Sequence, residues 1–403
     1  MEVFRSWVAS KDSSEWLIYV KRLSGNDTGI TGSHQAGVFL PKEVVSGALP
    51  SLMTITEKNP EVYITARLSS QNFPEQKVRG IYYNNKFHQG TRNEHRVTQW
   101  NTDVRNNPLQ DGERTGSLVF FAFHVKTQGL DADYLDVWLC NDNHEEDYIE
   151  GCIGEIVPGN WAFGAGNNIF GGLAITPAIQ ETNVQIPEAW KTTFPSGEAI
   201  VLFMDQTFRL DRSTPDRLLI DKRKVEYKLF RQVEEVHVLQ QVRDGFQSVD
   251  EFMQVANSVS NRRKSRSGRS LEIHLASIFT EFGLVEFSSQ CKTEGNKKPD
   301  FIFPSCRQYH NPDYPSKGLR MLAVKTTCKD RWRQVLNEAD RVEEIHLFTL
   351  QEGVSLNQFK EMQAEKVRLV VPDILHEKYP KEIRDELISL SDFIEDTKKM
   401  ASS

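Results

Sequence analysis

The chain has 403 residues, of which 38% are hydrophobic and 26% charged, and its formal net charge is −7. This composition is typical of a globular protein, and the length predicts two or three domains. The sequence has no apolar run near the ~18 residues of a membrane span, no secretory leader, and five cysteines without a CxxC pair. These features argue against a membrane, secreted or disulfide-framework protein, and they predict a reducing cytoplasm.

Residues 1–172 are predicted to be mostly strands. Short β-branched or aromatic segments recur between Gly, Asn, Asp or Pro, at 16–23, 36–41, 61–68, 78–84, 117–125 and 134–140. One helix is expected at 42–48, after Pro41. The polar segments 24–35 and 84–96 are expected to be flexible loops. The spacing of the strands predicts an all-β barrel or sandwich.

A glycine-rich passage at 163–172 lacks Gly-Lys-Ser/Thr, so it is not a phosphate-binding P-loop and is interpreted as a turn that ends the β domain. Residues 173–197 contain three prolines and little periodicity, which predicts a linker. The predicted organisation is therefore a β domain at 1–172, a linker at 173–197 and a second domain at 198–403.

The second domain begins with apolar residues at helical spacing. Helices are expected at 224–246, at 248–263 and at 270–284, the last with Ser270 as its N-cap and Gly283 near its end. Strands follow at 301–303, 320–327, 344–350 and 367–372, alternating with helices at 330–341, at 355–364 and up to about residue 397. This order predicts an α/β domain with a mixed sheet flanked by helices.

Charge is unevenly distributed along the chain. Residues 131–155 contain nine Asp/Glu and no Lys/Arg, whereas 261–341 contain sixteen Lys/Arg and nine Asp/Glu. The run NRRKSRSGRS at 261–270 is the most basic part. It is either a phosphate-binding patch or a solvated loop beside a helix. The acidic stretch is expected to face away from any polyanion.

Three residues carry the predicted chemistry. Asp300 opens a short apolar strand, Lys325 lies within the next strand, and Glu338 follows 13 residues later. A lysine inside an apolar strand is costly unless its ammonium is paired or used. Two carboxylates and one lysine suffice for metal-dependent phosphodiester hydrolysis. The alternative is a surface turn at Asp300 and an unrelated Lys–Glu ion pair.

The pattern resembles that of PD-(D/E)XK nucleases, with Ala323 where an acid is expected and Glu338 as the displaced acid. The segments GNKKPDFIFPS, MLAVKTTCKDRWRQVLNEADR and NSVSNRRKSRSGRSLE, together with IYVKRLSGNDTG and TRNEHR, resemble the EcoRII family of type IIE restriction endonucleases over nearly the whole chain. The resemblance implies an N-terminal pseudobarrel of the plant DNA-binding type and a C-terminal restriction-endonuclease-like domain.

For activity, the resemblance implies Mg²⁺-dependent double-strand cleavage at CCWGG before the first C. It implies that the C-terminal domain cleaves as a homodimer. It further implies that the N-terminal domain restrains it until a second copy of the site binds there as effector. The system would include a cognate DNA methyltransferase. The implied catalytic residues are Asp300, Lys325 and Glu338, with Asp300 and Glu338 as metal ligands and Glu272 as a weaker addition.

The resemblance also suggests residues that contact DNA. Lys329, Asp330 and Arg331 would read C and G edges, because Arg or Lys donates to guanine O6/N7 and a carboxylate accepts from cytosine N4. Arg333, Arg262, Arg263 and Lys264 would contact phosphates. In the N-terminal domain, Ser33, His34, Gln35, Arg92, Asn93, Glu94, His95 and Arg96 would line DNA-clamping arms, and Lys21 and Arg22 would hold the DNA backbone.

Two other functions remain open from the sequence. One is a non-catalytic, sequence-specific DNA-binding regulator, although such a protein usually loses one member of the catalytic set. The other is a repair or RNA-processing nuclease, although two base-reading elements are unusual in an enzyme that reads structure. Cleavage of a plasmid into a discrete ladder, a smear or nothing would separate the three.

Overall fold

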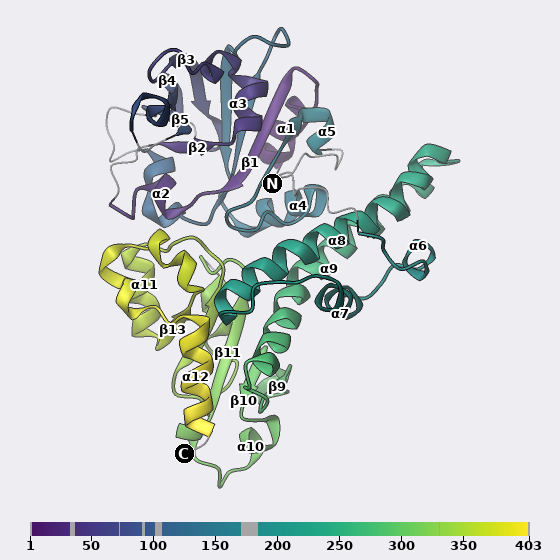
Figure 1. Cartoon of the computed structure of the whole chain (residues 1–403), viewed down its shortest axis with the longest axis vertical. Coiled ribbons are helices and arrows are strands. Elements are labelled where there is room, and N and C mark those ends of the chain that lie inside the picture. Colours follow the sequence, from purple (N-terminus) through teal and green to yellow (C-terminus); the bar gives the residue numbers. More distant parts are fainter. Residues whose placement is uncertain are drawn as a thin grey trace. The chain divides into compact units, whose positions relative to one another are not determined.

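The computed structural model describes residues 2–32, 37–71, 73–90, 93–100, 107–170, 184–329 and 331–401. The chain forms two compact units (Figure 1). The first comprises Met1–Ala178 with Gln351–Gln358 and Glu377–Glu382, and the second comprises Ile179–Leu350, Phe359–His376 and Ile383–Ser403. The predicted linker at 173–197 lies partly outside the described residues, so the predicted boundaries stay a prediction.

The first unit is built on one curled sheet of eight strands. In spatial order these are β2 (Val38–Leu40), β5 (Glu94–Thr98), β4 (Phe73–Tyr83), β3 (Glu61–Leu68), β7 (Tyr134–Leu139), β6 (Leu118–His124), β1 (Trp16–Arg22) and β8 (Trp161–Ala165). All neighbours pair antiparallel except β3 and β7, which are parallel. The predicted all-β architecture is confirmed.

Both faces of this sheet are covered. Along β6, Phe121 and Phe123 face one apolar core while Phe120 and Ala122 face another, because successive side chains of a strand alternate. The first core also takes in the helix α3 (Lys42–Ala48), which the sequence predicted. The second apolar core is covered by the helices α1 (Glu2–Ser10), α4 (Asn143–Ile153) and α5 (Gly166–Phe170). A further short helix of this unit, α2, spans Gly25–Thr28.

The prediction of a flexible loop over 84–96 is only partly correct. A short 3-10 helix spans Asn85–His88, but Glu94–Thr98 form β5, which pairs with β4 and β2. The strand forms because His95, Arg96 and Val97 are buried in the sheet rather than displayed on an arm.

The second unit contains a five-stranded mixed sheet. Its strands, in order, are β13 (Val367–Val370), β12 (Ile345–Thr349), β11 (Arg320–Lys325), β10 (Phe301–Phe303) and β9 (Ser288–Ser289). The first three are parallel, and the last two add antiparallel pairs. The helices are α6 (Ala189–Thr192), α7 (Gly197–Thr207), α8 (Pro215–Asp244), α9 (Val249–Glu281), α10 (Cys306–His310), α11 (Leu356–Ala364) and α12 (Leu390–Ala401). The predicted mixed sheet flanked by helices is confirmed.

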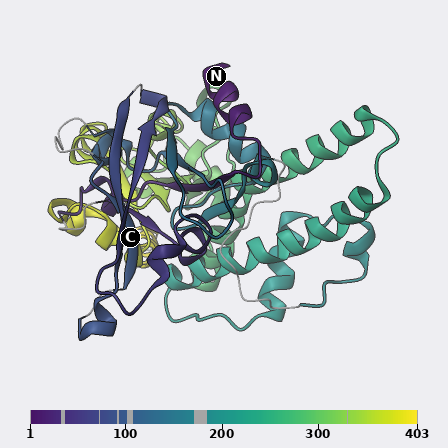
Figure 2. The same cartoon turned by 90° about the horizontal axis from the view of Figure 1, so that it is seen from above.

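Two long helices replace the three predicted between 224 and 284. α8 and α9 run side by side (Figure 2), and α9 is continuous for 33 residues. Ser270 is not an N-cap: it is buried within α9, where its hydroxyl accepts from Arg223 at 2.6 Å and donates to Glu226 at 3.0 Å. The basic run at 261–270 is therefore part of a helix and not a loop, because contacts with α8 favour the helical conformation there.

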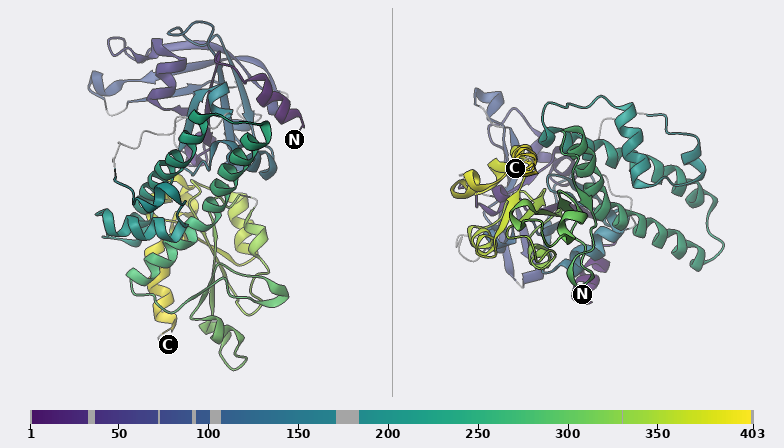
Figure 3. Two further views of the ribbon diagram at one scale, coloured as in Figure 1. Left: turned by 90° about the vertical axis from the view of Figure 1, so that its right-hand side faces the viewer. Right: turned by 90° about the horizontal axis from the view of Figure 1, so that it is seen from below.

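The helix α12 lies beside the mixed sheet (Figure 3). Phe393 of α12, Phe279 of α9 and Phe303 of β10 contact one another with ring centroids 5.6 to 6.2 Å apart. The start of α12 is tied to the start of α8, since the buried Asp216 carboxylate accepts the backbone N–H groups of Leu390 and Ser391. Within the described residues, no helix combines the length and the apolar character needed to cross a bilayer.

Candidate active site

Asp300 immediately precedes β10 and is 9% exposed. One of its carboxylate oxygens accepts the backbone N–H of Val324 at 2.7 Å, across the antiparallel pair of β10 and β11. The other accepts the side-chain amide of Gln290 at 3.1 Å. Burial raises the pKa of Asp300, and the charge of Lys325 opposes this shift. The sheet register therefore fixes this carboxylate at the end of the strand pair.

Lys325 is the last residue of β11 and is half-buried. It shares a strand face with Ala323, the fully buried residue in the position where nucleases of this pattern have an acid. Its positive charge acts on Asp300, Glu338 and Glu272. The lysine is thus balanced by carboxylates from three separate segments.

Glu338 does not lie on a helix, in contrast to the helix predicted at 330–341. A short 3-10 helix covers Arg331–Val335, and turns follow it. The backbone here is held by another segment: the Thr293 hydroxyl donates to the Glu338 carbonyl at 2.5 Å, and the Lys297 ammonium donates to the Asn337 carbonyl. These contacts replace helical hydrogen bonds and still bring Glu338 to the site.

The Glu338 carboxyl is strongly perturbed. Burial raises its pKa to about 7. The positive charges of Lys325 and Lys297 oppose this rise, and the negative charge of Asp300 adds to it. Its Oε2 atom is buried and has no hydrogen-bond partner among the described residues. A buried carboxylate oxygen without a partner is energetically unfavourable, so this atom is suited to accept an external ligand.

Glu272 joins the group from α9. The side-chain amide of Gln290 donates to Glu272 at 2.9 Å and thereby bridges it to Asp300. Burial raises the pKa of Glu272, and the Asp300 charge adds to the rise. Sequence reasoning missed Gln290, because a glutamine directly after a serine pair carries no motif. Its φ of +52° marks it only in the structure.

The donor set fits a hard divalent cation. All three carboxyls have a raised pKa, chiefly because burial disfavours their charged forms; the Asp300 charge adds to the rise at Glu272 and Glu338, and the Lys325 charge opposes the rise at all three. They do not form one tight ligand group: in the described part of the chain only Cys291, Cys306 and His310 bring their ligand atoms within 4.8 Å of one another. Asp300 and Glu338 alone suffice, since Mg²⁺ is usually held by one or two carboxylates with water and substrate phosphate.

Two of the three residues predicted to read bases are described. Lys329 and Arg331 follow β11, and Asp330 lies outside the described residues. Arg333 is exposed; its guanidinium stacks 4.5 Å from the Trp332 ring and pairs with Glu361 at 2.5 Å. Lys329 and Arg331 therefore follow, within six residues of the sequence, the strand that carries Lys325.

The basic cluster of α9 is partly neutralised within the protein. Arg263 is 8% exposed and makes a bidentate ion pair with Glu234 of α8, at 2.8 and 2.7 Å. Arg266 pairs in the same way with Glu226. Arg262 stacks over Phe194 and lines a cavity of about 830 Å³ between α7, α8 and α9. Lys264 lies in α9, but its side chain is not among those that the structure describes. Arg263 is thus corrected from a phosphate contact to a buried ion pair.

Most of the predicted N-terminal clamp is either not described or buried. Ser33, His34, Gln35 and Arg92 lie outside the described residues. His95 is buried and stacks on Tyr82 at 3.9 Å, and burial lowers its pKa to about 4. The buried Arg96 donates to the carbonyl of Gly37 and to Glu94. The assignment of His95 and Arg96 to an exposed DNA-clamping arm is therefore wrong.

The two basic residues of β1 are also paired. Lys21 pairs with Asp27 at 2.6 Å. Arg22 is 5% exposed and pairs with Glu146 and Glu150, both at 2.7 Å. These acids belong to the stretch 131–155, so part of that acidic charge serves the interior. Arg22 is therefore corrected from a DNA-backbone contact to a core ion pair.

Asn93 of the predicted clamp contacts its own loop, where its side-chain oxygen accepts the backbone N–H of Lys86.

Comparisons with known proteins point to the same family over both halves of the chain. A family model described as "EcoRII C terminal" matches residues 230–394, and one described as "Restriction endonuclease EcoRII, N-terminal" matches residues 12–168. The "Type II restriction enzyme EcoRII" of Escherichia coli is 48% identical over 394 residues, covering 98% of this chain and 97% of that protein.

Two solved structures show a weaker likeness. "Metal-depleted Ecl18kI in complex with uncleaved, modified DNA" is 18% identical with a TM-score of 0.42, covering 53% of this chain and 80% of that one. "Metal-depleted Ecl18kI in complex with uncleaved DNA" is 19% identical with a TM-score of 0.42, covering 54% of this chain and 86% of that one.

Proposed function

The chain belongs to the EcoRII family of type II restriction enzymes, and on this premise we propose that Asp300, Lys325 and Glu338 make it a Mg²⁺-dependent endonuclease for double-stranded DNA. The observation that carries the proposal is the convergence of Asp300, Glu338 and Glu272 around Lys325, with one Glu338 oxygen buried and without a partner in the described part of the chain. An enzyme of this class hydrolyses phosphodiester bonds at a specific site.

The residues divide the work in this mechanism. Asp300 and Glu338 would hold the cation, which when bound polarises the phosphate and lowers the pKa of the attacking water. The Lys325 ammonium binds a phosphate oxygen and stabilises the negative charge that develops there. Gln290 keeps Asp300 and Glu272 in fixed orientations through its two hydrogen bonds. Val324 fixes the second Asp300 oxygen through its backbone N–H.

The target sequence and the effector control are proposed by analogy with the family. The proposed target is CCWGG, cut before the first C by a homodimer in the cytoplasm. A second copy of the site, bound by the N-terminal unit, would release the restrained catalytic unit. Host DNA would be protected by a cognate methyltransferase. Such activation requires that effector DNA contact the restrained and released states differently.

Two matched plasmids test this proposal, one with a single CCWGG and one with three, each with Mg²⁺ or with EDTA. We expect metal-dependent, discrete cutting of the three-site plasmid and resistance of the single-site plasmid. Discrete cutting at other sequences would keep the enzyme and refute the target. Tight binding in a gel shift without any cutting would refute the nuclease in favour of a DNA-binding regulator.

Arg331 and Arg333 provide a matched pair for base reading. An arginine bidentate to guanine contributes ~1–3 kcal/mol of discrimination, so Arg331→Ala should lower affinity for the specific site by about 10- to 100-fold and leave non-specific affinity nearly unchanged. Arg333→Ala, which removes a phosphate contact, should weaken binding to all sequences alike. Gel shifts on specific and scrambled duplexes measure both. Equal losses on the two duplexes for Arg331→Ala would show that it contacts phosphate instead.

A further inference from the structure

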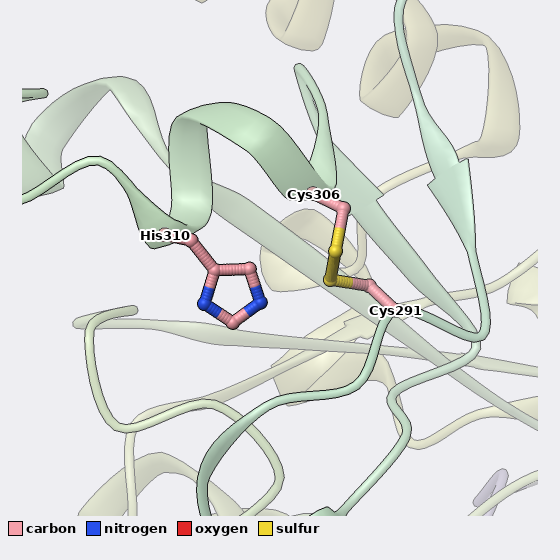
Figure 4. A group of neighbouring side chains, drawn as sticks. All are labelled: Cys291, Cys306 and His310. Carbon is pink, nitrogen blue, oxygen red and sulfur yellow. A yellow bond between two sulfur atoms is a disulfide. The ribbon is translucent and has the colours of Figure 1, made fainter.

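A disulfide joins Cys291 to Cys306 (Figure 4), and Cys291 is the next residue after Gln290, which contacts Glu272 and Asp300 of the candidate active site. Cys291 is buried and follows Gln290; Cys306 is half-buried and begins α10. The exposed His310 of α10 lies beside the two sulfurs, with its Nε2 hydrogen-bonded to the Lys292 carbonyl at 2.9 Å. The cysteine count and spacing argued against a disulfide framework, and they carried no signal for this single bond.

The bond closes a stretch that organises the carboxylates. Asp300 lies inside it, and so do Thr293 and Lys297, which hold the backbone at Glu338 and Asn337. The Tyr309 hydroxyl of α10 donates to Glu294 within the stretch at 2.6 Å. Both the Asp300 carboxylate and the segment that carries Glu338 therefore depend on the conformation of this closed stretch.

Gln290 connects the bond to the site. It is adjacent to Cys291, and its backbone has the left-handed φ of +52° that non-glycine residues rarely adopt. In that conformation its amide bridges Glu272 and Asp300. A disfavoured conformation persists only while its surroundings fix it, and the cross-link at the next residue is one such constraint.

We propose that Cys291 and Cys306 form a thiol–disulfide exchange site whose oxidised form holds the metal-binding carboxylates in place. The co-reactants are low-molecular-weight thiols and their disulfides. Two thiols, R–SH, transfer two electrons and two protons to the bond, giving Cys291–SH, Cys306–SH and R–S–S–R. The reverse reaction restores the cross-link. The first step is attack of a thiolate on one sulfur, through a mixed disulfide.

The surroundings of the pair favour such exchange. Small thiols can reach Cys306, which is half-buried beside the exposed His310. An imidazole near a cysteine sulfur favours the thiolate, which is the reactive form. Two of the other three cysteines are less suited: burial raises the pKa of Cys140 well above its ordinary value and that of Cys328 to about 12.

The first test counts thiols in the full-length protein, after denaturation, with a maleimide reagent. We expect three reactive thiols in the oxidised protein, from Cys140, Cys152 and Cys328, and five after treatment with dithiothreitol. Hydrogen exchange of the native protein should then be faster at 292–300 in the reduced form. Five thiols in oxidised protein, or equal exchange in the two forms, would overturn the proposal.

The second test rests on the proposed nuclease function. Reduction should raise the Mg²⁺ concentration for half-maximal cleavage by about tenfold, the lower end of the effect of losing partners that orient metal ligands. Gln290→Ala should show the raised requirement in both redox forms, whereas Cys152→Ser should respond like the wild type. An unchanged requirement after confirmed reduction would overturn the proposal. If neither form cleaves DNA, the nuclease assignment fails, while thiol counting and exchange still decide this inference.

Discussion

Replacing Lys325 with alanine should abolish DNA cleavage and leave DNA affinity largely intact. Its ammonium is the positive charge shared by Asp300, Glu338 and Glu272, and it would face the phosphate in the transition state. Removing one preorganised electrostatic donor costs about 10²–10³-fold in rate. The loss should be at the upper end or beyond, because three carboxylates then lose their counter-charge. Single-turnover cleavage with Mg²⁺ measures the rate, and gel shifts with Ca²⁺ measure binding.

Lys317→Ala is the control for this variant, because Lys317 is exposed and is not part of the carboxylate group. It should cleave at the wild-type rate. If Lys325→Ala retained activity within tenfold of wild type, the catalytic assignment of Asp300, Lys325 and Glu338 would be wrong. Circular dichroism of both variants distinguishes a chemical effect from misfolding.

Cation binding should weaken steeply as the pH falls below about 7. Burial raises the pKa of the Glu338 carboxyl to about 7, so below that pH it is protonated and cannot serve as an anionic ligand. The Mg²⁺ concentration for half-maximal cleavage should rise about tenfold per pH unit below 7, in line with loss of one proton on binding, and level off above it. Glu338→Gln should bind the cation weakly at every pH.

The same carboxyl affects stability in the metal-free protein. Its pKa is higher in the folded state, so folding takes up a proton between the unfolded pKa near 4.5 and about 7. This contribution favours the folded state below about pH 4.5 and is lost as the pH rises through 7. In thermal unfolding with EDTA, the fall in unfolding free energy between about pH 4.5 and 7 that comes from this carboxyl should be present in wild type and absent in Glu338→Gln.

For the metal-binding prediction, a Mg²⁺ requirement independent of pH between 6 and 8 would contradict the assigned role of Glu338.

Much of the site could be predicted because its residues are close in sequence and follow strand rules. Asp300 immediately precedes β10 and Lys325 ends β11, and an antiparallel pair brings such ends together. The strands of the first unit were recognisable because short β-branched and aromatic segments between turn residues fit a sheet buried on both faces. The structure brings Glu338 near Asp300 and Lys325, but the predicted helix at 330–341 is wrong, because Thr293 and Lys297 of a separate loop bind the Glu338 and Asn337 carbonyls; the role of Glu338 stays a prediction.

The remaining features could not be predicted, because they depend on side-chain partners that are far away in the sequence. Ser270 has the local features of an N-cap, yet Arg223 and Glu226 of α8 bind it inside a continuous helix. Arg22 and Arg96 have the composition of DNA contacts, yet both are buried with internal partners. A local pattern reports that a charge is present, and only the fold determines which group neutralises it.

The ion pairs between α8 and α9 also bear on how the protein responds to ionic strength. Arg263 and Arg266 are bound by Glu234 and Glu226, so they do not neutralise phosphates and do not displace the cations condensed on DNA. Affinity falls with salt by a slope of ~0.9 per phosphate neutralised. The slope contributed by the run 261–270 therefore corresponds to about two fewer phosphates than its five basic residues suggest. Because buried pairs are screened far less than exposed charges, the same arginines should keep α8 and α9 together at salt concentrations that release DNA.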